Sequence, residues 1–198
     1  MGAVGVLVAI AGVVATFFTW RATQTLARIE KRRWHEDLTP EFDVRIDDNR
    51  LAVAFTGPTG LGQLDEVTVT IQDNGGVDRF SQTHAGGPTR DEVAAHIWGP
   101  RRFDTDATDQ ALDDTGRTAR AHLIHELGSW HPLLLSPTQP PGWSAPSSAD
   151  WPVAVKAWAR DYGDKPVRVL ITCRHGAHEP WNVLHQIDPP PGGWPMPS

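Results

Sequence analysis

The stretch that decides the fold is residues 41–55, EFDVRIDDNRLAVAF. Its apolar residues alternate with polar ones on both sides of the pair Asp48-Asn49, first over residues 42–46 and again over 51–55. Alternation with a period of two predicts strands with one buried face, and an aspartate–asparagine pair favours a tight turn. Residues 41–55 therefore predict two strands joined by a short turn, the start of an antiparallel sheet.

The same alternation returns in residues 66–72, EVTVTIQ, where every second residue is valine or isoleucine. The turn residues 73–76 follow, and residues 77–81 are expected to be the hairpin partner of this strand. Four more segments combine apolar residues with flanking glycine or proline. Further strands are therefore expected at 121–127, 130–135, 167–173 and 181–185.

Two short helices are expected between these strands. Residues 89–92, TRDE, form a capping-box pattern ahead of a helix that reaches Ile97. A second helix begins after Asp150, which can cap it, and ends before Gly163. Its apolar residues recur at helical spacing and form one face: Trp151, Val155, Trp158 and Tyr162.

The remaining segments predict irregular structure. Residues 104–118 are rich in Asp, Thr and Gly and are expected to form a long exposed loop. Residues 136–148 combine prolines with serines, which is typical of a surface connection. Residues 189–198, PPPGGWPMPS, predict a disordered Pro/Gly-rich tail.

Short strands, frequent turns and few helices predict a mainly-β globular domain over residues 40–188. The chain contains 17 prolines and 18 glycines, which agrees with strands joined by many turns. We expect an immunoglobulin-like antiparallel sandwich with one or two inserted helices. The Cys…Trp…Cys pattern of true immunoglobulin domains is absent from the sequence, and an α+β fold is the alternative.

A different kind of segment precedes this domain. Residues 2–20 carry no charge, and a helix of that length would measure about 28 Å, close to the apolar thickness of a bilayer. A cleaved signal peptide is less favoured because no basic residue precedes the apolar run. Residues 1–20 therefore predict a transmembrane helix, and residues 21–39 a juxtamembrane helical stalk that ends before Pro40.

The charges beside this segment predict its orientation. Basic residues gather on its C-terminal side, which the positive-inside rule places in the cytoplasm. We therefore expect a single-pass cell-membrane protein with its N-terminus outside and its domain cytoplasmic. The bilayer is then a partner through residues 1–20, and anionic headgroups are candidate partners of four residues of the stalk. These residues are Arg28, Lys31, Arg32 and Arg33.

The domain itself is acidic. From Leu38 onward the chain contains 13 basic and 21 acidic residues. Nucleic-acid binding needs clustered Lys and Arg to displace counterions from phosphates, so no nucleic-acid partner is expected. A single cysteine, Cys173, excludes an intramolecular disulfide.

Several segments resemble those of a group of small actinobacterial single-pass membrane proteins: WHEDLTPEFDV, LDEVTVTI, AGGPT, HIWGPRRF, PVRVLITCR and HEPW. The excess of arginine over lysine, 15 to 3, agrees with the high-GC coding bias of such organisms. The resemblance implies an N-terminal span, a juxtamembrane helix and a β-rich domain. It implies architecture and carries over no catalytic residue.

Candidate chemistry is confined to histidine and cysteine. Cys173, His175 and His178 offer zinc-type ligands on one strand and its following turn, but a fourth ligand is not evident. A second H-x-x-H pair, His122 and His125, would point to opposite faces of a strand. The sequence contains no motif for catalysis or for a cofactor, so we predict no catalytic residue and no cofactor.

Tryptophan is frequent, with nine in the chain. Trp130, Trp143 and Trp194 lie near proline or glycine, where aromatic side chains can bind extended segments of a partner. We therefore expect a membrane-anchored, non-enzymatic interaction or scaffold module at the cytoplasmic face. The alternatives are a metal-binding enzyme or sensor that uses Cys173, His175 and His178, and an extracellular surface-binding module.

Overall fold

The structure is a computed structural model of the chain, and it divides into two compact units, Met1–Thr39 and Pro40–Ser198. It describes residues 35–75, 87–106, 111–120, 126–145, 147–176 and 178–195, together with Arg21, Thr23, Thr25, Leu26, Glu30 and Arg33.

In the first unit, every described residue from Arg21 to Asp37 is helical, and a turn follows at Leu38. Thr25 Oγ1 donates to the carbonyl of Arg21 at 2.9 Å, one helical turn earlier. The predicted membrane span, residues 1–20, lies outside the described residues, as do Arg28, Lys31 and Arg32 of the predicted headgroup site, whereas Arg33 is exposed. Within the described part of the chain, no helix combines the length and the apolar character needed to cross a membrane.

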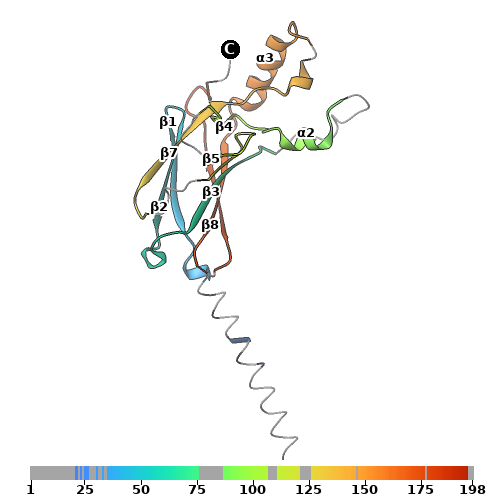
Figure 1. Cartoon of the computed structure of the whole chain (residues 1–198). Helices are drawn as coiled ribbons and strands as arrows, with labels where there is room; N and C mark the ends of the chain where they lie inside the picture. The colour runs from blue at the N-terminus through green and yellow to red at the C-terminus, as the bar shows by residue number, and fades with distance from the viewer. Residues whose placement is uncertain are drawn as a thin grey trace, which may run out of the picture. The chain divides into compact units, whose positions relative to one another are not determined.

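The second unit contains two antiparallel sheets that face each other (Figure 1). Within the described residues, the first sheet has the strand order β1-β2-β7-β4 and the second β5-β6-β3-β8-β9. The strands of the first sheet are β1 (Glu41–Asp47), β2 (Arg50–Gly57), β7 (Trp130–Pro137) and β4 (Arg101–Phe103). Those of the second are β5 (Ala111–Leu112), β6 (Thr118–Arg120), β3 (Glu66–Gln72), β8 (Val167–Arg174) and β9 (Trp181–Ile187).

The hairpin predicted from residues 41–55 is confirmed. β1 pairs with β2 in a register that places Asp47 opposite Arg50 and leaves Asp48 and Asn49 as a two-residue turn. Both turn residues have positive φ, 43° and 63°. Two consecutive left-handed residues match the right-handed twist of the strands, and Asp and Asn tolerate that conformation better than other non-glycine residues.

The core lies between the sheets and consists of the inward side of each alternating strand. Val53 and Phe55 of β2, and Val69 of β3, have no exposed surface. Burial of each such side chain contributes roughly 1.5–3 kcal/mol to folding. Further apolar residues with at most 2% exposure include Leu51, Leu64, Val67, Ile71, Phe103, Leu133, Val167, Val169, Ile171 and Cys173. The prediction of a mainly-β, sandwich-like domain is therefore confirmed.

Some strands form where the sequence predicted irregular structure. β5 and the beginning of β6 lie in the expected loop 104–118, and β4 was not expected at all. These strands have two or three residues each, too few to show a period. They are ordered by pairing with longer neighbours: β6 with β3, and β4 with β7. The expected strand at 77–81 and most of that at 121–127 lie outside the described residues.

Two α-helices, α2 (Arg90–Ala95) and α3 (Trp151–Tyr162), and two 3-10 helices, η1 (Thr59–Leu61) and η3 (Gly142–Ser144), accompany the described strands. The capping box of α2 is confirmed, because Glu92 N donates to Thr89 Oγ1 at 3.2 Å and Thr89 N donates to Glu92 Oε2 at 2.7 Å. Asp150 precedes α3 as expected, but its carboxylate accepts from Ser147 Oγ at 2.6 Å and caps no helical N–H.

We use the name helical lobe for α2, residues 96–99, η3 and α3, which lie at one end of the sandwich (Figure 1). The lobe has its own apolar cluster, distinct in composition from the sandwich core. It consists of Val93, Trp98, Trp158 and Tyr162, with the partly buried Trp143 packed against them. Aromatic rings dominate here, whereas aliphatic side chains dominate between the sheets.

The expectation of a disordered tail at 189–198 does not hold for Trp194, which is 8% exposed. Its backbone N donates to the carbonyl of Gly163 at 2.9 Å and its Nε1 to that of Lys165 at 2.8 Å. Its ring lies 5.5 Å from the guanidinium of Arg101, a residue with only 1% of its surface exposed. Burial of this large ring over a buried cation orders a segment whose composition alone predicts disorder.

Candidate ligand-binding site

Of the three predicted metal ligands, Cys173 lies inside the sandwich. It belongs to the buried face of β8 and has no exposed surface. Burial raises the pKa of its thiol to about 12, because the apolar surroundings disfavour the thiolate. Metal binding and nucleophilic attack both require the thiolate, so this cysteine is a core residue.

His175 and His178 lie in the turn between β8 and β9, with their rings stacked at a centroid distance of 6.1 Å. His175 Nδ1 forms a 2.9 Å hydrogen bond with the carbonyl of Gln63, and the ring of His178 packs on that of Trp181 at 5.4 Å. The structure thus brings these two histidines together and leaves Cys173 in the core. Among the described residues, no three His, Cys, Asp or Glu side chains are grouped to hold a metal ion. His122 and His125 lie outside the described residues.

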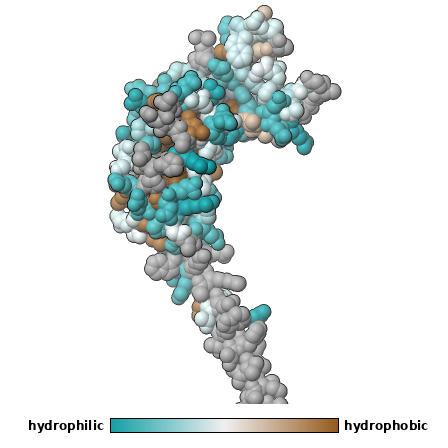
Figure 2. Space-filling model, in the orientation of Figure 1, coloured by the Kyte–Doolittle hydropathy of each residue, from teal (hydrophilic) through white to brown (hydrophobic). Residues whose placement is uncertain are grey.

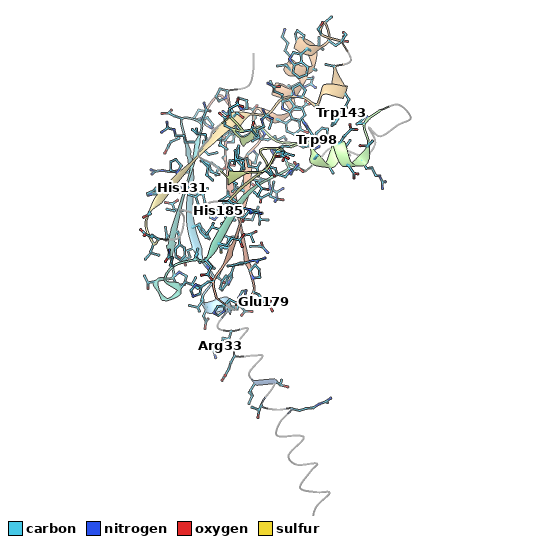
Figure 3. The ribbon with its side chains drawn as sticks, viewed as in Figure 1. Arg33, Trp98, His131, Trp143, Glu179 and His185 are labelled. Atoms are coloured by element: carbon cyan, nitrogen blue, oxygen red, sulfur yellow. The ribbon has the colours of Figure 1, made fainter. Side chains whose placement is uncertain are left out.

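The most unusual chemical environment belongs to His96, a residue that the sequence did not single out. Three tryptophan rings surround its imidazole edge-on, those of Trp98 at 5.1 Å, Trp158 at 5.3 Å and Trp143 at 5.8 Å. Trp143 packs against the buried cluster that contains Trp98, and both residues are labelled near α2 in Figure 3. The three tryptophans come from a loop, α3 and η3, so no local pattern in the sequence could have predicted their assembly.

Hydrogen bonds from the sandwich hold the His96–Trp98 segment in place. The carboxylate of Asp73, directly after β3, accepts from the backbone N of Trp98 at 2.8 Å. Arg117 makes an ion pair with the same carboxylate at 3.2 Å and donates from Nη2 to the carbonyl of His96 at 2.8 Å. This ion pair is largely buried, with 20% and 16% of the two side chains exposed, so it orients the loop firmly.

A second set of bonds joins α3 to the same loop. Trp158 Nε1 donates to Thr138 Oγ1 at 3.1 Å, and that hydroxyl donates to the carbonyl of Gly99. Trp98 Nε1 donates to the carbonyl of Val93 at 3.0 Å, which fixes the ring against α2. The polar atoms of Trp98 and Trp158 are therefore used within the lobe, and their rings form a fixed wall.

The imidazole of His96 is uncharged near neutral pH. Burial lowers its pKa to about 4, because the surroundings disfavour the imidazolium. The carboxylate of Asp73 opposes this shift, and the positive charges of Arg117 and Arg102 add to it. Nε2 of the ring is buried without a hydrogen-bond partner. A neutral imidazole has one donor and one acceptor nitrogen, and the tautomer decides which role Nε2 takes.

His96 lines a cavity of about 410 Å³ between α2 and the proline-rich segment that follows β7. Arg102 and Trp143 line the same cavity, and each also has a buried N–H without a partner, on Nε and Nε1 respectively. An unsatisfied buried polar group costs about 1–3 kcal/mol, so three in one cavity need an explanation. The rest of the lining consists of Glu92, Ala95, Ile97, Thr115, Thr138, Gln139, Pro140, Pro141 and Gly142.

A larger hollow of about 610 Å³ lies on the other side of Pro140 and Pro141, along α3. Trp98, Trp158 and Tyr162 line it, and the space-filling view shows residues of intermediate hydropathy gathered over α3 (Figure 2). Two acidic residues line it as well, Asp150 and Asp161, but no basic residue does. We call this space the aromatic hollow. Ser144, Val153, Ala154 and Ala157 complete its lining.

Comparison of the chain with protein-family models, with curated proteins and with solved structures finds no match.

Proposed function

We propose that the protein is a membrane-anchored, non-enzymatic interaction or scaffold module at the cytoplasmic face, and that the aromatic hollow is its binding surface. The observation that supports this proposal is the hollow itself, about 610 Å³ in volume and walled by Trp98, Trp158 and Tyr162. Tryptophan and tyrosine are the residues that most often carry binding energy in protein interfaces. The sandwich core does not contain these three rings.

The charges of the aromatic hollow favour a partner segment that carries a lysine or arginine. Asp150 and Asp161 line the hollow without a basic residue beside them in the lining. Arg160 Nε donates to one oxygen of Asp161 at 2.9 Å from outside, so Asp150 supplies most of the uncompensated charge.

The anchor in this proposal is the uncharged segment 2–20, with the basic residues on its C-terminal side directed to the cytoplasm. The resemblance to actinobacterial single-pass membrane proteins supports the same architecture. Anionic headgroups at Arg28, Lys31, Arg32 and Arg33 would add to membrane attachment at about 1 kcal/mol for each basic residue. An extracellular surface-binding module is the same molecule in the opposite orientation.

We further propose that the sandwich is immunoglobulin-like. The spatial order β1-β2-β7-β4 corresponds to strands A-B-E-D of a constant-type domain, and β3-β8-β9 to strands C-F-G. In this correspondence β5 and β6 are an inserted pair that extends the second sheet beside β3. Cys173 lies on β8, which corresponds to strand F, one of the two strands that the disulfide of antibody domains joins, but the chain has no second cysteine to pair with it.

A photo-crosslinking amino acid at Val153 tests the interaction. Val153 lines the aromatic hollow and is 69% exposed, so the probe disturbs no packing. Leu184 on β9, which is 52% exposed and is not part of the lining, is the matched control position. In cells that express the full chain, we expect a crosslinked protein from position 153 and not from 184, lost when Asp150→Lys is added. Equal crosslinking from both positions would contradict the proposal.

Membrane attachment and orientation are tested together. The full chain should sediment with membranes and resist alkaline carbonate, whereas a chain lacking residues 1–20 should not. For orientation, Ser148→Cys places a thiol at an exposed position, while Cys173 is buried and serves as an internal control. An impermeant thiol reagent should label the introduced thiol only after the cells are opened. Labelling of intact cells would assign the domain to the outer face instead.

A further inference from the structure

The smaller cavity, lined by His96, Arg102 and Trp143, presents hydrogen-bonding atoms that the protein itself does not use. The inference drawn from it goes beyond the proposed function, because it depends neither on the membrane anchor nor on the aromatic hollow. The two spaces share Pro140 and Pro141 in their linings, but their polar residues differ.

Two of the unused atoms are donors. Arg102 Nε and Trp143 Nε1 are buried N–H groups, and neither has a hydrogen-bond partner. Arg102 also makes no ion pair with any described residue. A guanidinium N–H and an indole N–H in the lining of one cavity are suited to the two oxygens of a carboxylate.

The third unused atom is Nε2 of His96, which is buried without a partner. In the tautomer that carries its proton on Nδ1, Nε2 presents a lone pair, and the lowered pKa of His96 keeps the ring uncharged near neutral pH. The imidazole lies edge-on to the indole of Trp143, with centroids 5.8 Å apart. Both rings line the same cavity.

A carboxylate from the protein also lines this cavity. It belongs to Glu92, an exposed residue whose Oε2 accepts from Thr89 in the capping box of α2. The lining thus combines a positive charge at Arg102 with acceptors at His96 and Glu92. A simple anion would pair only with the positive charge of Arg102. A molecule with a carboxylate and an adjacent donor would pair with this charge and would also donate to an acceptor in the lining.

We propose that this cavity binds an α-amino or α-hydroxy carboxylate group. Arg102 and Trp143 donate to the carboxylate oxygens, and His96 Nε2 accepts from the N–H or O–H on the neighbouring carbon. The cavity volume of about 410 Å³ lies in the range of small-molecule sites and exceeds that of a single carboxylate. Pro140, Pro141 and the indole of Trp143 leave apolar surface for the remainder of the ligand.

Two sources present this group, a free amino or hydroxy acid and the C-terminal residue of a peptide, whose backbone N–H takes the place of the amine. Titration of the full chain in detergent micelles by calorimetry distinguishes them. One arm contains free amino acids and small hydroxy acids, the second N-acetylated amino acids and short peptides with a free C-terminus, and the third the same peptides amidated at the C-terminus. We expect saturable binding in the first or second arm and at least tenfold weaker binding in the third.

Three variants identify the site. Arg102→Gln keeps an amide donor but removes the charge, and should weaken binding by about tenfold or more. Trp143→Phe keeps the ring but removes the N–H, and should weaken binding several-fold. Arg50→Gln removes an exposed arginine from β2, outside the lining, and should leave binding unchanged. Far-UV circular dichroism identifies any variant that fails to fold. If Arg102→Gln does not fold, the binding affinity of Trp143→Phe decides whether the ligand occupies this cavity.

The proposal is overturned if no ligand of the first two arms binds at millimolar concentration, or if amidated peptides bind as well as free acids. Binding that neither Arg102→Gln nor Trp143→Phe weakens overturns it as well. Crosslinking from position 153 should not change in Arg102→Gln, so failure of this site and failure of the aromatic hollow give different results.

Discussion

The sandwich and the helical lobe are built from different residues and serve different ends. Between the sheets, Val, Ile, Leu and Phe fill the interior, and most have no more than 2% of their surface exposed. In the lobe, Trp98, Trp143 and Trp158 surround a histidine. These rings border the aromatic hollow and the smaller cavity. Three buried polar atoms in the lining of the smaller cavity lack hydrogen-bond partners. Unpartnered buried polar atoms also occur in the sandwich, for example on Arg101, but these three border one cavity, as expected of a region that binds a ligand.

This comparison predicts that the largest loss of stability follows from a cavity in the sandwich. Phe55→Ala removes a ring with no exposed surface from β2, and should lower the free energy of unfolding by about 3–5 kcal/mol. Urea unfolding of the full chain in detergent micelles measures the change. Leu184→Ala, at a 52% exposed position, should cost less than about 0.5 kcal/mol. Similar losses in the two variants would contradict the assignment of the core.

A change inside the lobe should have a smaller and more local effect. Trp158→Phe removes the Nε1–H that donates to Thr138 at 3.1 Å, together with part of a ring that is 6% exposed, and should cost about 1–2 kcal/mol. Amide hydrogen exchange should accelerate in α2 and α3 and remain slow in β3 and β8. Trp130→Phe, at a 40% exposed site on β7, is the control. Uniform acceleration would mean that lobe and sandwich unfold as one unit.

The buried histidine of the lobe makes stability depend on pH. The pKa of His96 is about 4 in the folded chain and about 6.5 in the unfolded chain, so between these values only the unfolded chain binds the proton. This contribution is complete above pH 6.5 and is lost as the pH falls toward 4. After allowance for partial solvent contact, it amounts to about 1–2 kcal/mol.

The variant His96→Gln isolates this contribution. His131 and His185 also have pKa values lowered by burial, so the unfolding free energy of both proteins should fall as the solution is acidified. The wild-type curve should fall more steeply than that of the variant between pH 6.5 and 4. NMR titration of the His96 ring, with a midpoint near 4, would measure the pKa directly. Parallel curves would show that His96 does not titrate differently on folding.

The smallest change in the free energy of unfolding is expected for a side chain whose polar atom makes no hydrogen bond within the protein. Trp143→Phe removes an N–H that has no partner, so it should change the unfolding free energy by about 0.5 kcal/mol or less despite the loss of ring area. Chemical denaturation measures this change, and Trp158→Phe provides the contrast, since its N–H is bonded. A loss as large as that of Trp158→Phe would mean that Trp143 is structural and would weaken the case for a ligand site.

The sandwich could be predicted from the sequence because its signals are local. Residues 41–55 and 66–72 alternate because each strand buries one face, and positive φ at Asp48 and Asn49 follows from the turn that joins the first pair. The capping box at Thr89 and the apolar stripe of α3 are equally local. Each of these patterns is complete within a few residues and can be read without knowledge of the fold.

The candidate site could not be predicted, because long-range contacts create it. His96, Arg102 and Trp143 lie on three separate segments and meet only after β4 has paired with β7 and α3 has packed on the loop before β4. The sequence instead drew attention to Cys173, His175 and His178, whose spacing resembles that of metal ligands. The alternation of β8 places the Cys173 side chain on the buried face of the strand. The three side chains are therefore not brought together, although they are close in sequence.

Trp194 carries a practical consequence. Its two N–H groups satisfy the carbonyls of Gly163 and Lys165, and its ring covers the guanidinium of Arg101. A truncation after Ile187, at the run of prolines, would remove the Trp194 ring from the buried guanidinium of Arg101 and expose that charge to water. Shortened versions made for crystallisation should therefore retain Trp194, and affinity tags belong elsewhere than directly after β9.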